Sequence, residues 1–279
     1  MKFINEASII AYIAWLTAEE RAAATIQKYA RDVRMFATWL QGVEVSKEKT
    51  VEYKNQLIET HMASSVNTTI ASLNSFFFFM GWSIKLNSLK IQKQTFRDEA
   101  KELTREEYER LVKAALNMSK IRIGLIIQTI ASTGIRVSEL RYITVSTTNT
   151  GKAVISNKGK TRTVFLPLKL QVALLDYAKE NDIESGCIFV TRTGKPIDRR
   201  DVWAGMKALC KFANVSETKV TPHNLRHLFA LEFYGKHKDV IRLADVLGHS
   251  NMNTTRIYTM ETGAEHRRLV NELGFVVGF

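Results

Sequence analysis

The segment Thr221–His227 carries a histidine and an arginine that could bind and act on a phosphate group. Thr221 suits the N-cap of a helix, and Pro222 suits its first position. His223 therefore lies in the first turn and shares one face with Arg226. The positive end of a helix favours an anion, a guanidinium can hold two phosphate oxygens, and an imidazole can transfer a proton. A purely structural role for the pair is the alternative.

A second arginine, Arg136, follows a predicted helix end at Gly134. Its neighbours in the sequence are apolar, so we expect its side chain to be drawn inward, where a guanidinium needs an anionic partner. Glu139, three residues later, could be that partner. An internal pair of Arg136 and Glu139 is therefore the alternative to a role in anion binding.

The segment Leu247–Tyr258 combines a histidine with a tyrosine. Gly248 ends one predicted helix, and residues 253–255 can cap the next, so Tyr258 follows on a short helix whose polar face could present its hydroxyl. Tyrosine can serve as a covalent nucleophile. Taken singly, a packed aromatic with a satisfied hydroxyl is the commoner role. His249 is the second polar candidate of this segment.

Helices and one small hairpin must position these residues. A capping box of Thr104 and Glu107 predicts that a helix begins there. Two strands are expected around Asn157–Lys160, which places Lys158 at a hairpin tip. The apolar spacing predicts further helices over 121–133, 168–179, 199–213, 222–234 and 239–247, strands over 153–156 and 161–166, and a short strand over 187–191. This second region is therefore predicted to be helical with a small antiparallel sheet.

The first region has the helical period throughout and no strict alternation. Its clearest helices are predicted over 25–40 and along the stripe from Val66 to Met80, each followed by a glycine. The four phenylalanines Phe76–Phe79 cannot all face one side of a helix. We expect them to form a crowded corner of the core, with a contact to another element or subunit as the alternative.

A polar, charged stretch over 85–101 separates the two regions and is typical of a linker. We therefore predict a helical first domain over 1–92, a linker over 93–103 and a second domain over 104–279, of which 262–279 form a tail.

Length and charge agree with two domains and an anionic partner. The chain has 279 residues and a formal net charge of +12, of which +2 belongs to residues 1–100 and +10 to residues 101–279. The apolar runs are too short to cross a bilayer, and the amino terminus does not match a secretory signal. We expect a cytoplasmic protein with no membrane partner. The lack of a glycine-rich phosphate loop argues against a nucleotide-dependent enzyme.

The combination resembles the tyrosine recombinase (phage integrase) family, whose signature is an arginine, a hairpin lysine, His-x-x-Arg, a histidine or tryptophan, and a nucleophilic tyrosine. The candidates for these positions are Arg136, Lys158, His223, Arg226, His249 and Tyr258. The resemblance implies a mainly α fold of the simple two-domain, Xer-like type. A helical core-binding, SAM-like domain would precede an α-rich catalytic domain with a small antiparallel sheet.

The resemblance also implies a site-specific DNA recombinase. Tyr258 would attack a scissile DNA phosphate, form a 3′-phosphotyrosyl bond and release a 5′-hydroxyl that later attacks the partner strand. The bond energy stays in the protein–DNA linkage, so no ATP, metal or other cofactor is implied. Arg136 and Arg226 would neutralise the charge that develops on the phosphate.

Three further residues receive roles in proton transfer or phosphate binding from the same resemblance. Lys158 is the candidate that protonates the 5′-oxygen leaving group. His223 would transfer a proton near the tyrosine hydroxyl, and His249 would donate a hydrogen bond to the phosphate.

Double-stranded DNA is the implied partner, enclosed between the two domains. We expect Lys90, Lys93, Lys160 and Arg162 to contact its phosphates, which gives affinity without much sequence information. The apolar terminal segment 267–279 could pack on its own domain or insert into a neighbour. Since members of the family act as tetramers linked by such tails, we expect a monomer that exchanges its tail and forms a tetramer on DNA.

Two departures from the family pattern lie next to the signature. Leu228 stands where relatives often have a small hydroxyl residue, and Met260 and Glu261 stand where a histidine is frequent. Two other functions stay open. One is a catalytically inactive or regulatory DNA-binding protein of the same fold, and the other is a DNA topoisomerase or hairpin-forming enzyme with the same phosphotyrosine chemistry.

Overall fold

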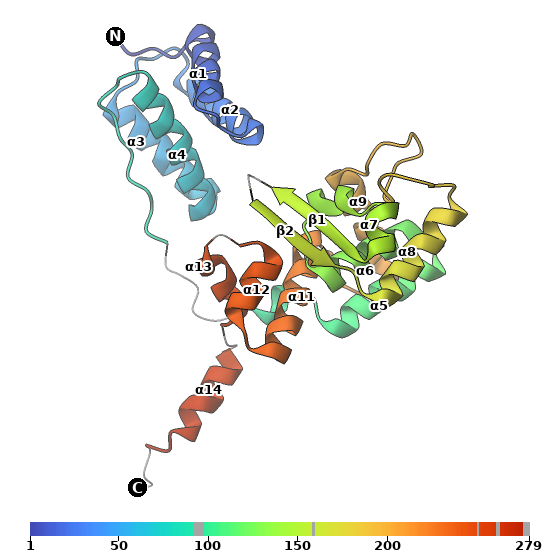
Figure 1. Cartoon of the computed structure of the whole chain (residues 1–279). Helices are drawn as coiled ribbons and strands as arrows, with labels where there is room; N and C mark the ends of the chain where they lie inside the picture. The colour runs from blue at the N-terminus through green and yellow to red at the C-terminus, as the bar shows by residue number, and fades with distance from the viewer. Residues whose placement is uncertain (92–97, 158–159, 250, 261–262, 276–279) are drawn as a thin grey trace. The chain divides into compact units, whose positions relative to one another are not determined.

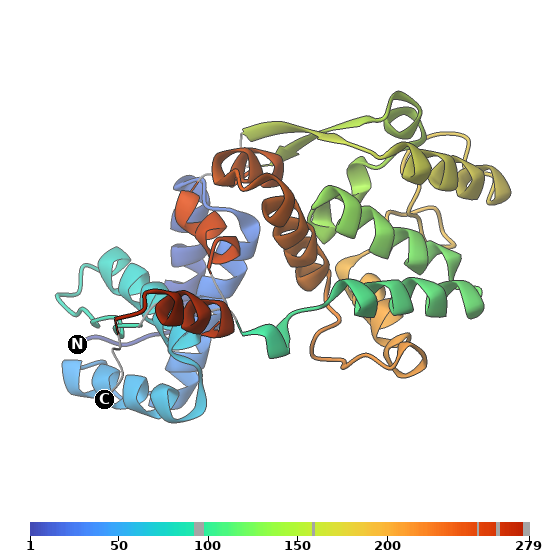
Figure 2. The same cartoon turned by 90° about the horizontal axis from the view of Figure 1, so that it is seen from below.

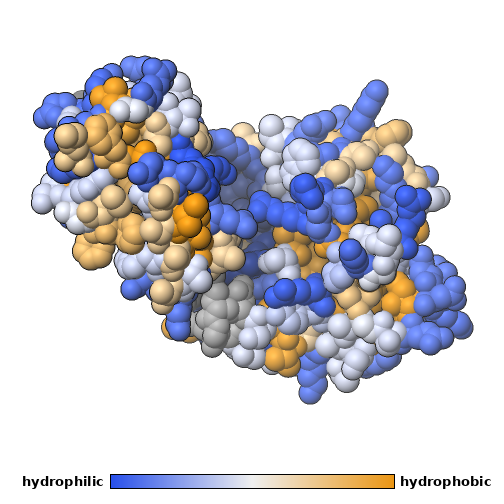
Figure 3. Space-filling model, turned by 90° about the horizontal axis from the view of Figure 1, so that it is seen from above, coloured by the Kyte–Doolittle hydropathy of each residue, from blue (hydrophilic) through white to orange (hydrophobic). Residues whose placement is uncertain are grey.

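The computed structural model describes residues 1–91, 98–157, 160–249, 251–260 and 263–275. The chain forms two compact units, Met1–Lys93 and Gln94–Phe279, and each is described by itself. No helix within the described ranges is long and apolar enough to cross a membrane. On the face drawn in Figure 3, hydrophilic residues alternate with separate hydrophobic patches, so hydropathy marks no single binding surface there.

Within its described residues, the first unit contains four helices (Figure 1). These are α1 (Glu6–Ala18), α2 (Ala23–Leu40), α3 (Lys47–Thr60) and α4 (Ala63–Phe79). The helices predicted over 25–40 and from Val66 to Met80 are confirmed as α2 and α4. Phe76 and Phe77 are fully buried in the core of this unit and Phe79 packs partly buried against it, whereas Phe78 is exposed. The predicted core corner is therefore confirmed for three of the four phenylalanines.

Residues 85–91 of the predicted linker stretch are tied to α4 by hydrogen bonds to Leu86 and Leu89. The side-chain amide of Asn74 donates to the Leu86 carbonyl (2.9 Å) and accepts from the Leu86 N–H (2.8 Å). Asn67 forms the same pair of hydrogen bonds with Leu89, at 2.9 and 2.7 Å. Two asparagines on α4 thus satisfy the backbone of a segment that has no secondary structure of its own. This segment belongs to the first unit.

The second unit is mainly helical with one hairpin. Its elements are α5 (Arg105–Asn117), α6 (Ile121–Thr133), the 3-10 helix η2 (Val137–Tyr142), α7 (Val145–Thr150), β1 (Lys152–Asn157), β2 (Lys160–Phe165), α8 (Leu168–Glu180), α9 (Arg199–Lys207), α10 (Cys210–Ala213), α11 (Pro222–His237), α12 (Val240–Leu247), α13 (Met252–Thr255), the 3-10 helix η3 (Arg256–Tyr258) and α14 (Gly263–Glu272), with a short 3-10 turn, η1, over Glu99–Lys101. The capping box of Thr104 and Glu107 is present at the start of α5.

The hairpin pairs β1 with β2 in an antiparallel register that places Ala153 opposite Val164 and Ile155 opposite Arg162. Ala153, Ile155 and Val164 are buried, while the alternate residue Val154 is exposed. One face of the hairpin therefore packs on the core of the second unit, as expected for strands with a period of two. The two predicted strands are confirmed.

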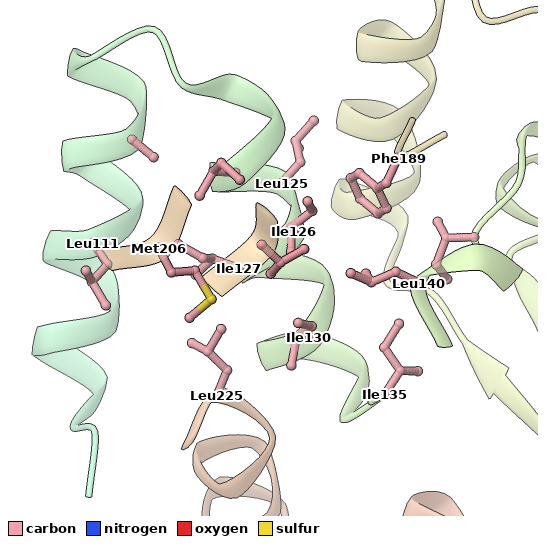
Figure 4. Packing of buried hydrophobic residues seen from close by; sticks show 14 of the residues in the cluster. Leu111, Leu125, Ile126, Ile127, Ile130, Ile135, Leu140, Phe189, Met206 and Leu225 are labelled. Atoms are coloured by element: carbon pink, nitrogen blue, oxygen red, sulfur yellow. The ribbon is translucent and has the colours of Figure 1, made fainter. Parts of the chain in front are cut away.

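Helix α6 lies at the centre of the second core (Figure 4). Ile126, Ile127 and Ile130 on α6 are fully buried. Around them pack Leu111 of α5, Leu140 of η2, Met206 of α9, Leu225 of α11 and Phe189. Helix α11 packs along α6 within this unit (Figure 2). The segment after α6 and the start of α11 are therefore held by one hydrophobic core.

Two predictions for the second unit are wrong in detail. The helix predicted over 199–213 is two helices, α9 and α10, which are separated at residues 208–209. The strand predicted over 187–191 is not a strand, because only isolated bridges, Thr144 to Cys187 and Val190 to Pro196, involve it. Ile188 and Phe189 are fully buried in the core, which explains an apolar run that mimics a strand.

Candidate active site

Gly134 ends α6 and turns the chain toward Arg136. Its φ of +66° is the left-handed region that favours glycine. A Cβ atom at this position would lie 2.4 Å from Cδ1 of Phe229 on α11, so a side chain has no room here. The Gly134 carbonyl accepts a hydrogen bond from Arg226. One glycine therefore brings the end of α6, the arginine that follows it and helix α11 together.

Arg136 pairs with Glu139 inside η2. The Arg136 N–H donates to Oε2 of Glu139 (2.7 Å), and its Nη1 donates to Oε1 (3.0 Å). The Glu139 side chain is only 2% exposed, whereas that of Arg136 is 36% exposed. Nη1 is the one guanidinium nitrogen of Arg136 that bonds to a described residue. The internal pair is thus confirmed, and it leaves an open side of the guanidinium that can bind an anion.

Arg226 is the most enclosed cation of the site, with 3% of the residue exposed. Nη1 donates to the Gly134 carbonyl (2.5 Å), and Nη2 donates to the Leu247 carbonyl (2.7 Å). Nη2 also lies 3.0 Å from Nε2 of His249. Burial and the neighbouring charge of Arg136 lower the pKa of Arg226 to about 10, so the guanidinium stays charged at neutral pH. It links the ends of α6 and α12 to α11.

His223 lies in the first turn of α11, as predicted. The Thr221 hydroxyl caps this helix by accepting from the Asn224 N–H (3.1 Å), and Pro222 is its first residue. Burial lowers the pKa of His223, and the charges of His227, Arg226 and Arg136 act in the same direction. His223 is therefore neutral at pH 7 and able to accept a proton.

The hydrogen bonds of His249 fix its tautomer. Because a guanidinium can only donate, Nε2 of His249 must accept from Arg226. Nδ1 then carries the proton and donates to the hydroxyl of Thr255 at 2.9 Å. Burial, followed by the charges of Arg226 and Arg136, lowers the pKa of His249 to about 4. In this state both ring nitrogens of His249 are bonded within the protein, so the predicted hydrogen bond to a phosphate requires His249 to give up one of these partners.

Tyr258 ends the 3-10 helix η3 and is 2% exposed. Its ring packs with Leu243 and Leu247 of α12, 5.0 Å from the His227 ring and 6.3 Å from the His249 ring. Burial raises the pKa of Tyr258, while the charges of Arg226 and Arg136 act in the opposite direction. The phenol is therefore protonated at neutral pH, and both arginines lie close enough to affect its ionisation.

The helix before Tyr258 begins differently from the prediction. Residues 253–255 were expected to cap it, but the side chain of Asn251 accepts from the Asn253 N–H (2.9 Å) and caps α13. Thr255 is buried inside α13 and bonds to His249 instead. Asn251 and residues 253–255 all carry side-chain oxygens that can accept from a backbone N–H at the start of a helix. The sequence alone could therefore not decide which of them caps α13.

Of the expected DNA contacts, Lys90 is exposed in the first unit. Lys158 and Lys93 lie outside the described residues, and of Lys160 only the backbone, at the start of β2, is described. Arg162 differs from the expectation, because its side chain is only 12% exposed and pairs with Glu139 instead of facing solvent. We therefore revise its predicted role as a phosphate contact.

Three partners of the site were not predicted from the sequence. Arg162 is a second cation on Glu139, Thr255 holds His249, and Glu102 lies 3.1 Å from Nε2 of His227. The alternation of β2 does predict that Arg162 shares the buried face of Val164, two residues on. No local signal pairs Glu102 with His227, because 125 positions separate them.

The arrangement supports phosphate chemistry. Arg136 and Arg226 supply two positive charges, His223 and His249 supply two neutral imidazoles, and Tyr258 supplies a phenol within the influence of both arginines. Preorganised cations beside a nucleophile stabilise the charge that develops on a phosphate under attack. Five of the six predicted signature residues therefore gather in the second unit, and Lys158, the sixth, lies outside the described residues.

We expect Gly134→Ala to destabilise the second unit by about 2–5 kcal/mol, through left-handed strain and overpacking against Phe229. Gly194→Ala is the matched control, since Gly194 has φ +75° and a Cβ added there would meet no atom within 4 Å, so about 1 kcal/mol is expected. Hydrogen exchange of the α6 amides measures both values. Equal losses in the two variants would show that the close approach of α11 is unimportant.

The lowered pKa of His249 predicts a pH dependence of stability. Its folded value of about 4 lies below the ordinary 6.5, so the unfolded chain binds more protons between these pH values. The free energy of unfolding should therefore fall as pH drops from about 6.5 to about 4. We expect this slope to be smaller in His249→Gln, as measured by chemical denaturation at each pH. A native slope in His249→Gln would contradict the assignment.

The comparisons with known proteins agree with this geometry. The family described as "Phage integrase family" matches residues 101–265, and "Phage integrase, N-terminal SAM-like domain" matches residues 9–83. The chain is 30% identical over 280 residues to "Tyrosine recombinase XerA" of Thermococcus onnurineus (strain NA1), with 98% of this chain and 96% of that protein covered.

Two solved structures show the same fold. One is XerH site-specific recombinase bound to difH substrate in a pre-cleavage complex, with 20% identity, TM-score 0.70 and coverage of 87% of this chain and 78% of that one. The other is a lambda integrase tetramer bound to a Holliday junction, with 18% identity, TM-score 0.73 and coverage of 91% and 76%. The expected mainly α fold is confirmed. Because the family match covers more than half of the chain and includes the residues gathered around Tyr258, the chain belongs to the phage integrase family of tyrosine recombinases.

Proposed function

We propose that the protein is a site-specific DNA recombinase that cleaves and rejoins DNA through a 3′-phosphotyrosyl intermediate on Tyr258. The observation that carries this proposal is that the phenol of Tyr258 lies close enough to the guanidinium groups of Arg226 and Arg136 for their charges to act on its pKa. A phosphate diester placed between the phenol and these cations would meet both a nucleophile and the charges that stabilise its attack.

The reaction forms one bond to phosphorus for each such bond that it breaks. The Tyr258 oxygen forms a bond to phosphorus as the bond from phosphorus to the 5′-oxygen breaks, and the phenol loses one proton while the leaving oxygen gains one. The neutral imidazole of His223 is the proposed acceptor near the phenol. Lys158 is the proposed donor to the leaving oxygen. The reverse attack by a 5′-hydroxyl of a partner strand rejoins the DNA without ATP.

Tyr258 must become more accessible for this step. Only 2% of the residue is exposed, and its ring is covered by α12 and by His227. We propose that the short elements α13 and η3 shift relative to α12 when DNA binds, so that the phenol oxygen becomes accessible. His249, which joins Arg226 to Thr255, would release at least one of these partners to donate to the phosphate.

DNA and a second copy of the chain are the proposed partners. One structural neighbour is a tetramer on a Holliday junction. Helix α14 and the residues after it expose Val270, Leu273 and Phe275, an apolar set suited to insertion into a neighbouring subunit. We propose that the tail exchanges between subunits on DNA, that residues 93–103 link the domains, and that the protein acts in the cytoplasm.

A nicked suicide substrate tests the chemistry, because the cleaved strand diffuses away and traps the covalent protein–DNA adduct. An adduct with the native protein supports phosphotyrosyl transfer, and its absence would favour an inactive DNA-binding protein of this fold. Two plasmid-borne sites then separate the active alternatives. Exchange between the sites supports a recombinase, whereas relaxation of a single supercoiled plasmid without exchange supports a topoisomerase.

A further inference from the structure

Arg162 occupies an unusual place for a charged residue of a two-stranded hairpin. It lies on the buried face of β2, opposite Ile155 on β1 and two residues before the buried Val164. Its side chain is 12% exposed. A guanidinium on such a face needs partners for its N–H groups, because an unpaired buried charge is costly.

All three nitrogens of this guanidinium have partners. Nη1 and Nη2 donate to the two oxygens of Glu139, at 3.0 and 2.7 Å, in a bidentate pair. Nε donates to the Val246 carbonyl near the end of α12, at 3.1 Å. The bidentate geometry is the strong form of an arginine–carboxylate pair and fixes the orientation of both groups. Every nitrogen of the Arg162 guanidinium therefore donates to a group of the protein itself.

The partners of Arg162 lead to two different parts of the site. Glu139 also accepts from the N–H and from Nη1 of Arg136, so Arg162 and Arg136 share one buried carboxylate. Val246 lies three residues before His249. Burial would raise the pKa of Glu139, but the hydrogen bonds and charges of the two arginines hold it below its usual value. Glu139 is thus ionised and accepts hydrogen bonds from both Arg136 and Arg162.

Gly248 leaves room for the Arg162 side chain beside the end of α12. A Cβ atom at Gly248 would lie 2.8 Å from Cδ of Arg162, and its φ of +65° favours glycine. The Arg162 side chain therefore passes directly beside the turn between α12 and His249. β2, η2 and the end of α12 meet at one guanidinium.

We propose that Arg162 is a positioning residue, which fixes Arg136 through Glu139 and fixes the end of α12 that carries His249. The inference rests on the proposed function, since it assigns Arg162 a role in the same phosphate site. It differs from a role as a DNA contact, which requires a guanidinium that is free to meet a phosphate. The two roles predict different kinetic changes.

The test compares Arg162→Met and Arg162→Lys with Arg200→Met and Arg200→Lys. Arg200 lies in the same unit, is 93% exposed and pairs with Asp198, so it controls for loss of an arginine charge. We expect single-turnover cleavage of a suicide substrate, at saturating protein, to slow about 10- to 100-fold in Arg162→Met, because Arg136 is misplaced. Arg162→Lys keeps one hydrogen bond to Glu139 and should recover part of the rate.

DNA affinity and a double variant separate positioning from contact or simple destabilisation. The DNA dissociation constant and its salt dependence should stay within about twofold of native, since no phosphate contact is lost. Arg162→Met should slow cleavage by a smaller factor when Arg136 is already replaced by lysine, because part of its effect acts through Arg136. The proposal would be overturned if the two substitutions slowed cleavage independently, so that their factors multiplied in the double variant. It would also be overturned if Arg162→Met bound DNA more weakly but cleaved at the native rate at saturating protein.

A measurement that does not depend on cleavage keeps the proposal separate from the proposed function. The Nε–H signal of Arg136 in nitrogen-15 NMR spectra, assigned by its loss in Arg136→Lys, should shift in Arg162→Met and stay in Arg200→Met. A shift without any native adduct would overturn the function and support the positioning role. A native adduct together with an unshifted signal would overturn the positioning role alone. If Arg162→Met unfolds, the same comparison is made with Arg162→Lys.

Discussion

Tyr258→Phe is expected to abolish the covalent adduct with a suicide DNA substrate while DNA binding is retained. The substitution removes one oxygen atom, the proposed nucleophile, and keeps the ring that packs against Leu243 and Leu247. The fold of the second unit should therefore persist, and we expect adduct formation to fall by a factor of about 10⁴ or more, because no other group replaces the nucleophile. Denaturing gels measure the adduct, and mobility shifts measure binding.

Tyr234→Phe is the matched control for the loss of a phenol oxygen. Tyr234 packs partly buried against the same cluster as Tyr258, and Lys238 lies over its ring. Adduct formation in this variant should equal that of the native protein. An adduct that persists in Tyr258→Phe would show that another residue attacks the phosphate, and would sink the proposed mechanism.

Arg226→Ala has the second large effect, because it acts on chemistry and on stability together. It removes a buried cation beside Tyr258 and leaves the carbonyls of Gly134 and Leu247 without their donor. Loss of one preorganised donor typically slows an enzyme about 10²- to 10³-fold, and a buried charge that neutralises phosphate should cost at least as much. Each unpaired carbonyl adds about 1–3 kcal/mol of destabilisation.

Arg226→Lys separates the two effects. Lysine keeps the charge but cannot donate in two fixed directions to Gly134 and Leu247 while also meeting His249. Because the buried site keeps a charge and a donor, we expect a smaller loss of stability than in Arg226→Ala and a cleavage rate that still falls about 10²-fold. Single-turnover rates and thermal unfolding measure the two quantities.

Arg110→Ala provides the control for lost carbonyl partners. Arg110 donates to the carbonyls of Ala213 and Asn214 elsewhere in the second unit, with no contact to the site. This variant should lose stability without losing the cleavage rate of its folded fraction. If the folded fraction of Arg226→Ala cleaves at the native rate, Arg226 is structural and the proposed charge stabilisation is wrong.

Local patterns predicted much of this fold because the causes are local. The end of α6 at Gly134 and the start of α11 at Thr221 depend on residues within a few positions, and the structure places both where the sequence predicted. The spacing of His223 and Arg226 likewise depends only on the helical period. Signals of this kind survive without knowledge of the tertiary structure.

Partners distant in sequence were predicted less well. The charge of Arg162 alone predicts a DNA contact, whereas the alternation of β2 places its side chain on the buried face. Its partner Glu139 lies 23 positions away in the sequence. The tautomer of His249 depends on Arg226, which is likewise 23 residues away. Burial and hydrogen bonding arise from packing between elements, so a single sequence specifies them only indirectly.

Mass spectrometry of the protease-digested adduct reports both the attached residue and the polarity of the linkage. Attack by Tyr258 predicts one peptide that contains Tyr258 and carries a nucleotide joined through its 3′-phosphate, with a free 5′-hydroxyl on the released strand. Attachment to any other residue, or a linkage to a 5′-phosphate, would show that Tyr258 does not form a 3′-phosphotyrosyl bond.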